Sequence, residues 1–129
     1  MSRFVRPQTR TLTLANGDQL IVKERLTAGE QRAHFARRYV HDAAGRLVLT
    51  PSGLIGDGIV VAYLLDWNLR DEAGQAVVIR DLSADDLQRV IDNLDIQSFD
   101  EIKTAIQAHE AAMVAEREAE KKTDGGTPS

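Results

Sequence analysis

The amino-acid sequence predicts an α+β fold: an N-terminal β-hairpin, about four helices packed as a small and mainly helical domain, and a disordered, charged C-terminal tail. Three observations support this class. An Asn-Gly pair separates two short runs rich in Thr, Leu, Ile and Val, which is a hairpin pattern. Several later segments begin with Ser or Thr and place an acidic residue three positions on, which is a helix-start pattern. The last residues are polar and carry no apolar period.

The 129-residue chain is expected to form one domain over residues 10–115, with a flexible N-terminus over 1–9 and a charged helix end and disordered tail over 116–129. A content of 43% hydrophobic residues is enough for a core. The absence of Cys excludes disulfides, thiolate metal sites and Cys nucleophiles, and fits a reducing compartment. Because no run approaches the roughly 20 apolar residues of a membrane span, a cytoplasmic protein without a membrane partner is expected.

Charge is distributed unevenly along the chain. Residues 1–80 carry 11 basic and 8 acidic side chains, which is a net charge of +3. Residues 81–129 carry 5 basic and 12 acidic side chains, which is a net charge of -7. This asymmetry suits a protein partner or head-to-tail self-association better than nucleic acid, which usually requires a basic domain.

The predicted hairpin spans residues 10–25, and two loop lengths are possible. A two-residue loop places Leu12 and Leu14 opposite Ile21 and Gln19. A three-residue loop, residues 15–17 with a left-handed glycine, instead puts Leu12, Leu14, Leu20 and Val22 on one face. The second register has the cleaner apolar face and is preferred.

Thr27 and Glu30 have the spacing of a capping box, so a helix is expected from about residue 28 to 40. Its apolar stripe is narrow: Phe35, Ala36, Tyr39 and Val40. Residues 43–45 are expected to end this element, and residues 47–49 suit a short extended piece. Thr50-Pro51 resembles a helix start, although the glycines at 53, 56 and 58 weaken it.

Residues 59–69 form the most apolar run and contain Trp67, the single tryptophan. The Ile-Val-Val sequence favours a strand, but the length of the run favours a helix, which is the interpretation adopted. Trp67 is expected to be buried against the hairpin or the C-terminal helices. Residues 71–74 are expected to form a turn and residues 75–79 an extended connector.

Two helices are predicted in the C-terminal half. Ser83 caps the first, whose apolar residues 87, 90, 91 and 94 follow the helical period. Ser98 and Glu101 are expected to cap the second after a break at residues 95–97. Its stripe comprises Phe99, Ile102, Ile106, His109 and Met113. A solvated helix is expected from residue 116 to 122, and disorder from 123 to 129.

Residues that could bind a partner follow from this pattern. The stripe of the last helix is expected to exceed what the domain covers, which leaves Met113, Val114 and, less so, Ile106 for another copy or a partner protein. Arg37 and Arg38 give the first helix a basic face, for which solvation is the default interpretation.

The sequence contains no catalytic, cofactor or metal pattern that outweighs an ordinary structural explanation. His34 and His41 lie seven residues apart on one predicted helix, and no metal-binding His spacing occurs. Asp85 and Asp86 lie in a first helical turn, where acidic residues favour the helix dipole. The glycines of residues 51–58 lack the Lys-Ser/Thr of a phosphate loop. Neither an enzyme nor a cofactor is therefore expected.

The order of these elements resembles a known family. The segments TLTLANGDQLIV, LTAGEQ, AYLLDWNLRDEAGQ, SADDLQRVIDNL and SFDEIKTAI, with a Glu/Lys-rich end, look like the small tail assembly chaperones of long-tailed bacteriophages and prophages. The resemblance spans roughly residues 10–122, and YLLDWNLRDEAG is its most recognisable part.

The resemblance implies a non-enzymatic assembly factor of the host cytoplasm that is absent from the mature virion. Such chaperones bind and solubilise the tape measure protein and help to recruit tail tube subunits. Many also have a longer form made by ribosomal frameshifting, and Glu120-Lys121-Lys122 is compatible with a slippery codon sequence. The alternative from another class is a nucleic-acid-associated phage or plasmid accessory protein that uses the basic N-terminal helix.

Overall fold

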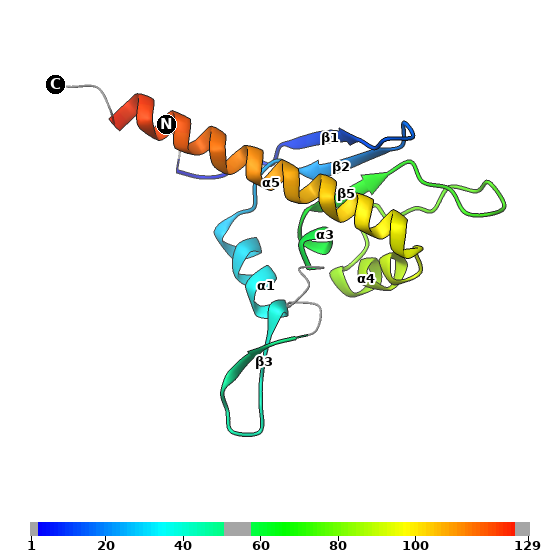
Figure 1. Ribbon diagram of the computed structural model, residues 1–129, viewed down its shortest axis with the longest axis horizontal. Coiled ribbons are helices and arrows are strands. Elements are labelled where there is room, and N and C mark those ends of the chain that lie inside the picture. The colour runs from blue at the N-terminus through cyan, green and yellow to red at the C-terminus, as the bar shows by residue number, and fades with distance from the viewer. Residues whose placement is uncertain (1–2, 51–57, 126–129) are drawn as a thin grey trace.

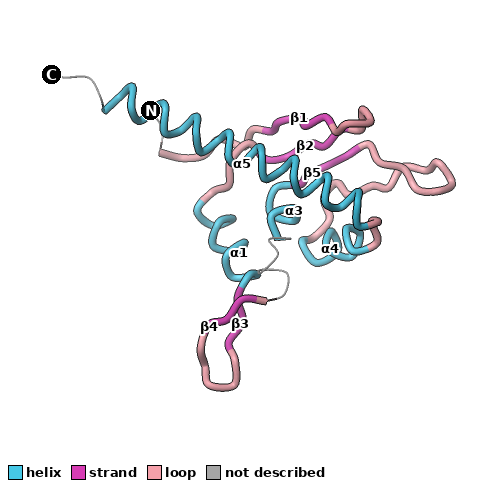
Figure 2. Tube along the Cα trace, in the orientation of Figure 1, coloured by secondary structure: helices cyan, strands magenta, loops and turns pink. Residues whose placement is uncertain are grey.

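The computed structural model describes residues 3–50 and 58–125 and has the predicted α+β architecture (Figure 1). A three-stranded antiparallel sheet of order β1-β2-β5 packs against helices, and a separate two-stranded hairpin projects from the body (Figure 2). The elements are β1 (Thr9–Thr13), β2 (Gln19–Lys23), α1 (Ala28–Arg38), β3 (Tyr39–His41), β4 (Leu47–Leu49), α3 (Gly58–Tyr63), β5 (Leu64–Trp67), α4 (Ala84–Asp92) and α5 (Ile96–Gly125).

The first hairpin has the three-residue loop that the sequence favours. Leu12 pairs with Leu20, and the Leu14 N–H donates to the Asp18 carbonyl at 2.7 Å. Gly17 closes the loop with a φ of 92°, a left-handed conformation that glycine adopts without strain. Leu14, Leu20 and Val22 are consequently buried on one face of the sheet.

The same loop design occurs three times in the described chain. Residues 15–17, 43–45 and 72–74 each form a three-residue loop that ends in a glycine with a φ between 79° and 92°. In the second and third loops the preceding aspartate, Asp42 or Asp71, accepts hydrogen bonds at 2.9 Å from two backbone N–H groups, one within the loop and one from the residue that follows it. The predicted turn at residues 71–74 is thus confirmed.

The core lies between the sheet and the helices. Its residues come from the first hairpin, α3, β5, the segment before α4, α4 and α5: Leu14, Leu20, Val22, Ile59, Val60, Tyr63, Leu64, Trp67, Ile79, Leu87, Ile91, Phe99, Ile102 and Ile106. The predicted stripe of the last helix is therefore the face of α5 that packs on this core.

Residues 64–69 are not helical, so the predicted helix over 59–69 is wrong in its second half. α3 ends at Tyr63, and the chain continues directly as β5, which pairs antiparallel with β2. The pairing of Leu20 with Trp67 and of Val22 with Leu64 leaves Leu65 as the extra residue of a bulge. Trp67 is 9% exposed, as expected, and its Nε1–H donates to the Val77 carbonyl at 2.7 Å.

Two other predicted boundaries are also wrong. Asp95, rather than Ser98, caps the last helix: its carboxylate accepts from the Ser98 N–H at 2.9 Å and the Ser98 hydroxyl at 2.7 Å. α5 then runs through Gly125, so residues 123–125 are helical rather than disordered. The suggested helix start at Thr50-Pro51 and the glycines at 53 and 56 involve positions outside the described residues.

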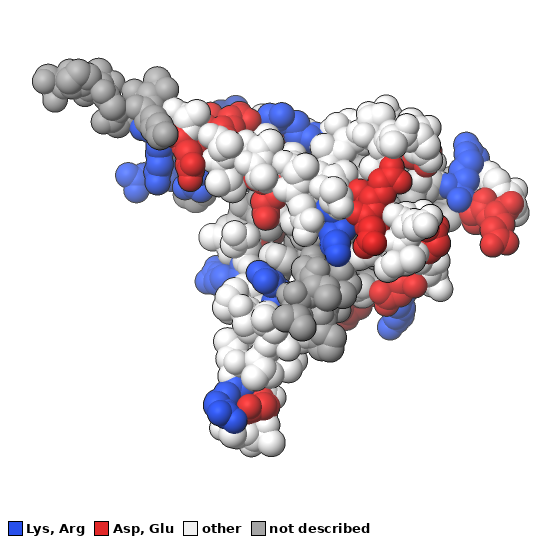
Figure 3. Space-filling model, viewed as in Figure 1, with Lys and Arg blue, Asp and Glu red and all other residues white. Residues whose placement is uncertain are grey.

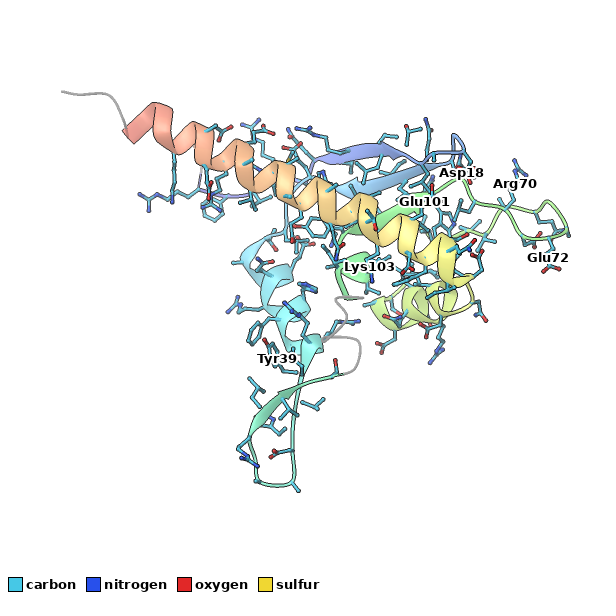
Figure 4. The ribbon with its side chains drawn as sticks, viewed as in Figure 1. Asp18, Tyr39, Arg70, Glu72, Glu101 and Lys103 are labelled. Atoms are coloured by element: carbon cyan, nitrogen blue, oxygen red, sulfur yellow. The ribbon has the colours of Figure 1, made fainter. Side chains whose placement is uncertain are left out.

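α5 crosses the sheet, and polar contacts fasten it along the first hairpin (Figure 1). Glu101 accepts from the N–H of Ala15 in the loop at 3.1 Å, and Figure 4 shows Glu101 near Asp18, the residue that follows this loop. Further along α5, the buried His109 places Nε2 3.0 Å from the carbonyl oxygens of both Lys23 and Glu24. Because two carbonyls can only accept, Nε2 carries the proton. His109 is therefore a structural residue, as the sequence indicates.

Candidate partner-binding surface

α1 and the β3–β4 hairpin form a projection from the body of the molecule, which we call the arm (Figure 1). α1 begins with the predicted capping box: Glu30 N–H donates to the Thr27 hydroxyl at 3.1 Å, and Thr27 N–H donates to the Glu30 carboxylate at 2.9 Å. The Glu30 carboxylate also pairs with Lys23 of β2. These contacts fix the start of α1 against the sheet, yet none of its residues is buried.

The predicted helix to residue 40 ends two residues earlier, and a second hairpin takes its place. Tyr39 pairs with Leu49, Val40 with Val48, and His41 with Leu47. His41 is therefore on a strand, not on the helix of His34. At the base of the hairpin, the Thr50 N–H donates to the Arg38 carbonyl at 2.7 Å.

The arm exposes large apolar side chains. Phe35 of α1 is 53% exposed and packs on Tyr39 with ring centroids 4.6 Å apart. The other members are on the hairpin. We call this set the arm patch: Phe35, Val40, Leu47, Val48 and Leu49, all between 39% and 53% exposed.

The hairpin exposes apolar residues on both of its faces. The register places Val40 and Val48 on one face, and Leu47 and Leu49 on the other. An isolated two-stranded hairpin is marginally stable in water, because it cannot bury a face of its own. Figure 3 shows the arm mostly uncharged on the side viewed, and Arg46 pairs with Asp42 at its loop at 3.4 Å. The arm patch therefore has the chemistry of a protein-binding surface.

The structure separates the partner-binding residues that the sequence suggested. Ile106 is 0% exposed and Met113 is 9% exposed, so the expectation that the last helix leaves them uncovered is wrong. Val114, on the same helix, is 53% exposed. Arg37 and Arg38 lie at the end of α1 beside the arm patch, where Arg37 approaches the Asp85 carboxylate at 3.8 Å. Arg38 is half-buried, and its Nε has no hydrogen-bond partner within the described residues.

The sequence analysis did not predict the second hairpin or the exposure of its apolar residues. The signal was present in the pattern Asp42-Ala-Ala-Gly-Arg46 between Tyr-Val-His and Leu-Val-Leu, which matches the three-residue loops described above. The stripe of Phe35 and Tyr39 was misleading, because Tyr39 continues the helical spacing although it is the first residue of β3. Exposure itself depends on tertiary structure and is not encoded in local spacing.

A recess of about 140 Å³ lies between α1, β2 and α3, and His34 lines it. Burial lowers the pKa of His34 below its ordinary value of 6.5; the charges of Arg38 and Arg37 also lower it, whereas Glu110 opposes this change. Its Nδ1 is buried without a hydrogen-bond partner within the described chain. The ring is thus held neutral where α1 meets the body.

Acidification is expected to destabilise the protein through His34. Its folded-state pKa is lowered, so the unfolded chain binds more protons and stability falls as the pH drops through about 6.5. Urea unfolding of the wild type and of His34→Gln at about pH 7.5 and pH 5.5 measures this effect. The variant should lose less stability over this interval than the wild type. Equal losses in the two proteins would contradict the assignment to His34.

Other polar clusters have structural partners. Arg80 donates to Asp66 of β5 at 2.7 Å, which lowers the pKa of that carboxyl. Tyr63 donates to Glu110 at 3.0 Å; burial and that carboxylate raise the pKa of the phenol. Within the described residues, no group of three or more His, Cys, Asp or Glu side chains is placed to hold a metal ion.

No helix in the described part of the chain has both the length and the apolar character needed to cross a membrane. Comparison of the chain with protein-family models, with curated proteins and with solved structures gave no match.

Proposed function

We propose that this chain is a binding protein of the assembly-factor class whose arm holds an apolar partner segment. The arm patch is the observation that supports this class, because both faces of the β3–β4 hairpin expose aliphatic side chains outside the core. Each of these side chains would gain about 0.8 kcal/mol for every methylene group that a partner covers.

More particularly, we propose a phage tail assembly chaperone that acts in the host cytoplasm. Its partner is the tape measure protein, a long, apolar and helix-rich protein that needs cover until the tail tube forms around it; recruitment of tail tube subunits follows. The resemblance of the YLLDWNLRDEAG region and of the order of elements supports this identity, and the arm patch supports the chemistry of the partner.

The nucleic-acid alternative has less support. Arg37 faces Asp85, and Arg38 is half-buried, so the end of α1 offers few unpaired cations. The net charge of -4 also opposes binding to a phosphate backbone. Arg32 is a further exposed arginine of α1. Salt-dependent binding of DNA by the wild type, abolished by Arg32→Ala, would favour the alternative and overturn the proposal.

A paired substitution in the arm tests the proposed function. Val40→Asp with Val48→Asp places two charges on one face of the hairpin, where the native residues are 51% and 39% exposed. We expect a change in folding stability of about 1 kcal/mol or less, since surface substitutions are usually mild. In co-expression with a phage tape measure protein, the soluble yield of that protein should fall to the level seen without this chain.

The matched control makes the same change at exposed apolar residues outside the arm. Val78 is 71% exposed and Ile96 is 70% exposed, so Val78→Asp with Ile96→Asp adds equal charge without touching the arm. This control should keep the tape measure protein soluble. If both double variants behave as the wild type does, or if the control fails as the arm variant does, the arm patch is not the binding surface.

A further inference from the structure

Among the residues that the structure describes, no strand pairs with the outer edge of β1. β1 pairs with β2 on one side and ends the sheet on the other. Glu24 N–H donates to the Gln8 carbonyl, and Leu14 N–H donates to the Asp18 carbonyl, so the even-numbered residues form the hydrogen-bonded pairs with β2. The N–H and C=O groups of Thr9, Thr11 and Thr13 therefore point outward from the sheet.

An open groove adjoins this edge, between β1 and α5. It has a volume of about 460 Å³, and its lining includes Leu12 of β1 and the small or apolar residues Ala105, Ala108, Ala112 and Met113 of α5. Arg10 also lines it, and two carboxylates compensate its charge: Glu24 at 3.4 Å and Glu116 at 4.0 Å. The groove beside the β1 edge is thus lined largely by alanine and leucine, and its arginine is paired with carboxylates.

We propose that the occupant of this edge and groove is a second copy of the same chain. In this homodimer the β1 strands pair antiparallel about a two-fold axis at Thr11, so that Thr9 faces Thr13 of the other copy. This register is possible because the backbone N–H and C=O groups of all three threonines point outward from the sheet. The pairing joins two three-stranded sheets into one sheet of six strands. The alanine side of each α5 then covers the join.

The charge pattern of β1 favours a second copy, and the size of the edge sets the strength of the contact. The self-paired edge, Thr-Arg-Thr-Leu-Thr, places Arg10 opposite Leu12, so no like charges stand directly opposite each other. β1 is about 17 Å long, and a strip of this length and about 20 Å deep on each copy buries roughly 700 Å² in total. An area of this size is that of a weak, reversible dimer. The interface lies away from the arm (Figure 1) and does not depend on the proposed function.

Two neighbouring alanines provide a matched test. Ala111 and Ala112 are both exposed on α5, but Ala112 lines the groove, and the helical turn points Ala111 about 100° away. Sedimentation velocity over a concentration series should show a dimer for the wild type and for Ala111→Glu. Ala112→Glu should weaken the dimer at least about tenfold, because the dimer would bury an unpaired carboxylate. A monomeric wild type, or equal dimerisation of the two variants, overturns the proposal.

Amide hydrogen exchange provides a second readout that does not require a variant. The outward amides of Thr9, Thr11 and Thr13 are expected to be protected in concentrated wild type and to lose that protection on dilution, together with the dimer. The amide of Leu14, bonded inside the hairpin, should change little and serves as the internal control. A dimer in which the three threonine amides exchange rapidly would place the contact elsewhere and overturn the proposal.

Discussion

Replacing Trp67 with alanine is expected to lower the free energy of unfolding by about 3–5 kcal/mol, the range for a large aromatic residue removed from a core. The indole of Trp67 on β5 is 9% exposed, and Trp67 pairs across the sheet with the fully buried Leu20 of β2. Its Nε1–H also donates to the Val77 carbonyl at 2.7 Å, which fastens the connector before α4 to the sheet. Urea denaturation followed by far-UV circular dichroism measures the loss.

A more conservative variant separates packing from hydrogen bonding at this position. Trp67→Phe keeps an aromatic ring but leaves the Val77 carbonyl without its indole donor, so a smaller loss of about 1–3 kcal/mol is expected. An alanine variant with an unchanged denaturation midpoint would show that the ring is not part of the core. It would then make Trp67 a candidate for partner binding.

The second large effect is expected at Ile106. Its side chain is 0% exposed in the face of α5 that packs on the core, so Ile106→Ala should cost about 2–5 kcal/mol through lost burial and the cavity that remains. Val114 is 53% exposed on the same helix and provides the control. Val114→Ala should change stability by about 0.5 kcal/mol or less. Similar losses in the two variants would contradict the observed orientation of α5.

Local signals predicted the fold where the structure is decided locally. The capping box of Thr27 and Glu30, the Ser83 cap and the glycine loop after Leu14 are all present, because each depends on hydrogen bonds among a few neighbouring residues. The period of the last helix also identified its packed face, since a helix with one apolar stripe turns that stripe to the core.

Long-range pairing decided the elements that were predicted wrongly. Residues 64–67 are as apolar as the helix before them, and their strand conformation depends on β2, more than 40 residues earlier in the chain. Tyr39 and Val40 continue the helical spacing of α1 but pair with β4 instead. At the start of α5, Asp95 and Ser98 are both acceptable caps, and local sequence does not rank them.

The candidate surface was the least predictable feature. From the sequence, Met113 and Val114 were both expected to be uncovered and available to a partner. The packing of α5 buries Met113 and exposes Val114. The apolar residues of the β3–β4 hairpin would be ordinary core residues if the hairpin packed on the body. Their exposure follows from the direction in which the arm projects, which no local pattern specifies.

Hydrogen exchange of the proposed complex between this chain and a tape measure protein tests the central claim most directly. Amides of the β3–β4 hairpin of the arm, residues 39–49, should exchange more slowly in the complex than in the free chain, because the proposed partner covers both faces of a hairpin with no core of its own. The β5 and α4 amides should change little. Unchanged exchange across the arm, with new protection confined to another surface, would contradict the account.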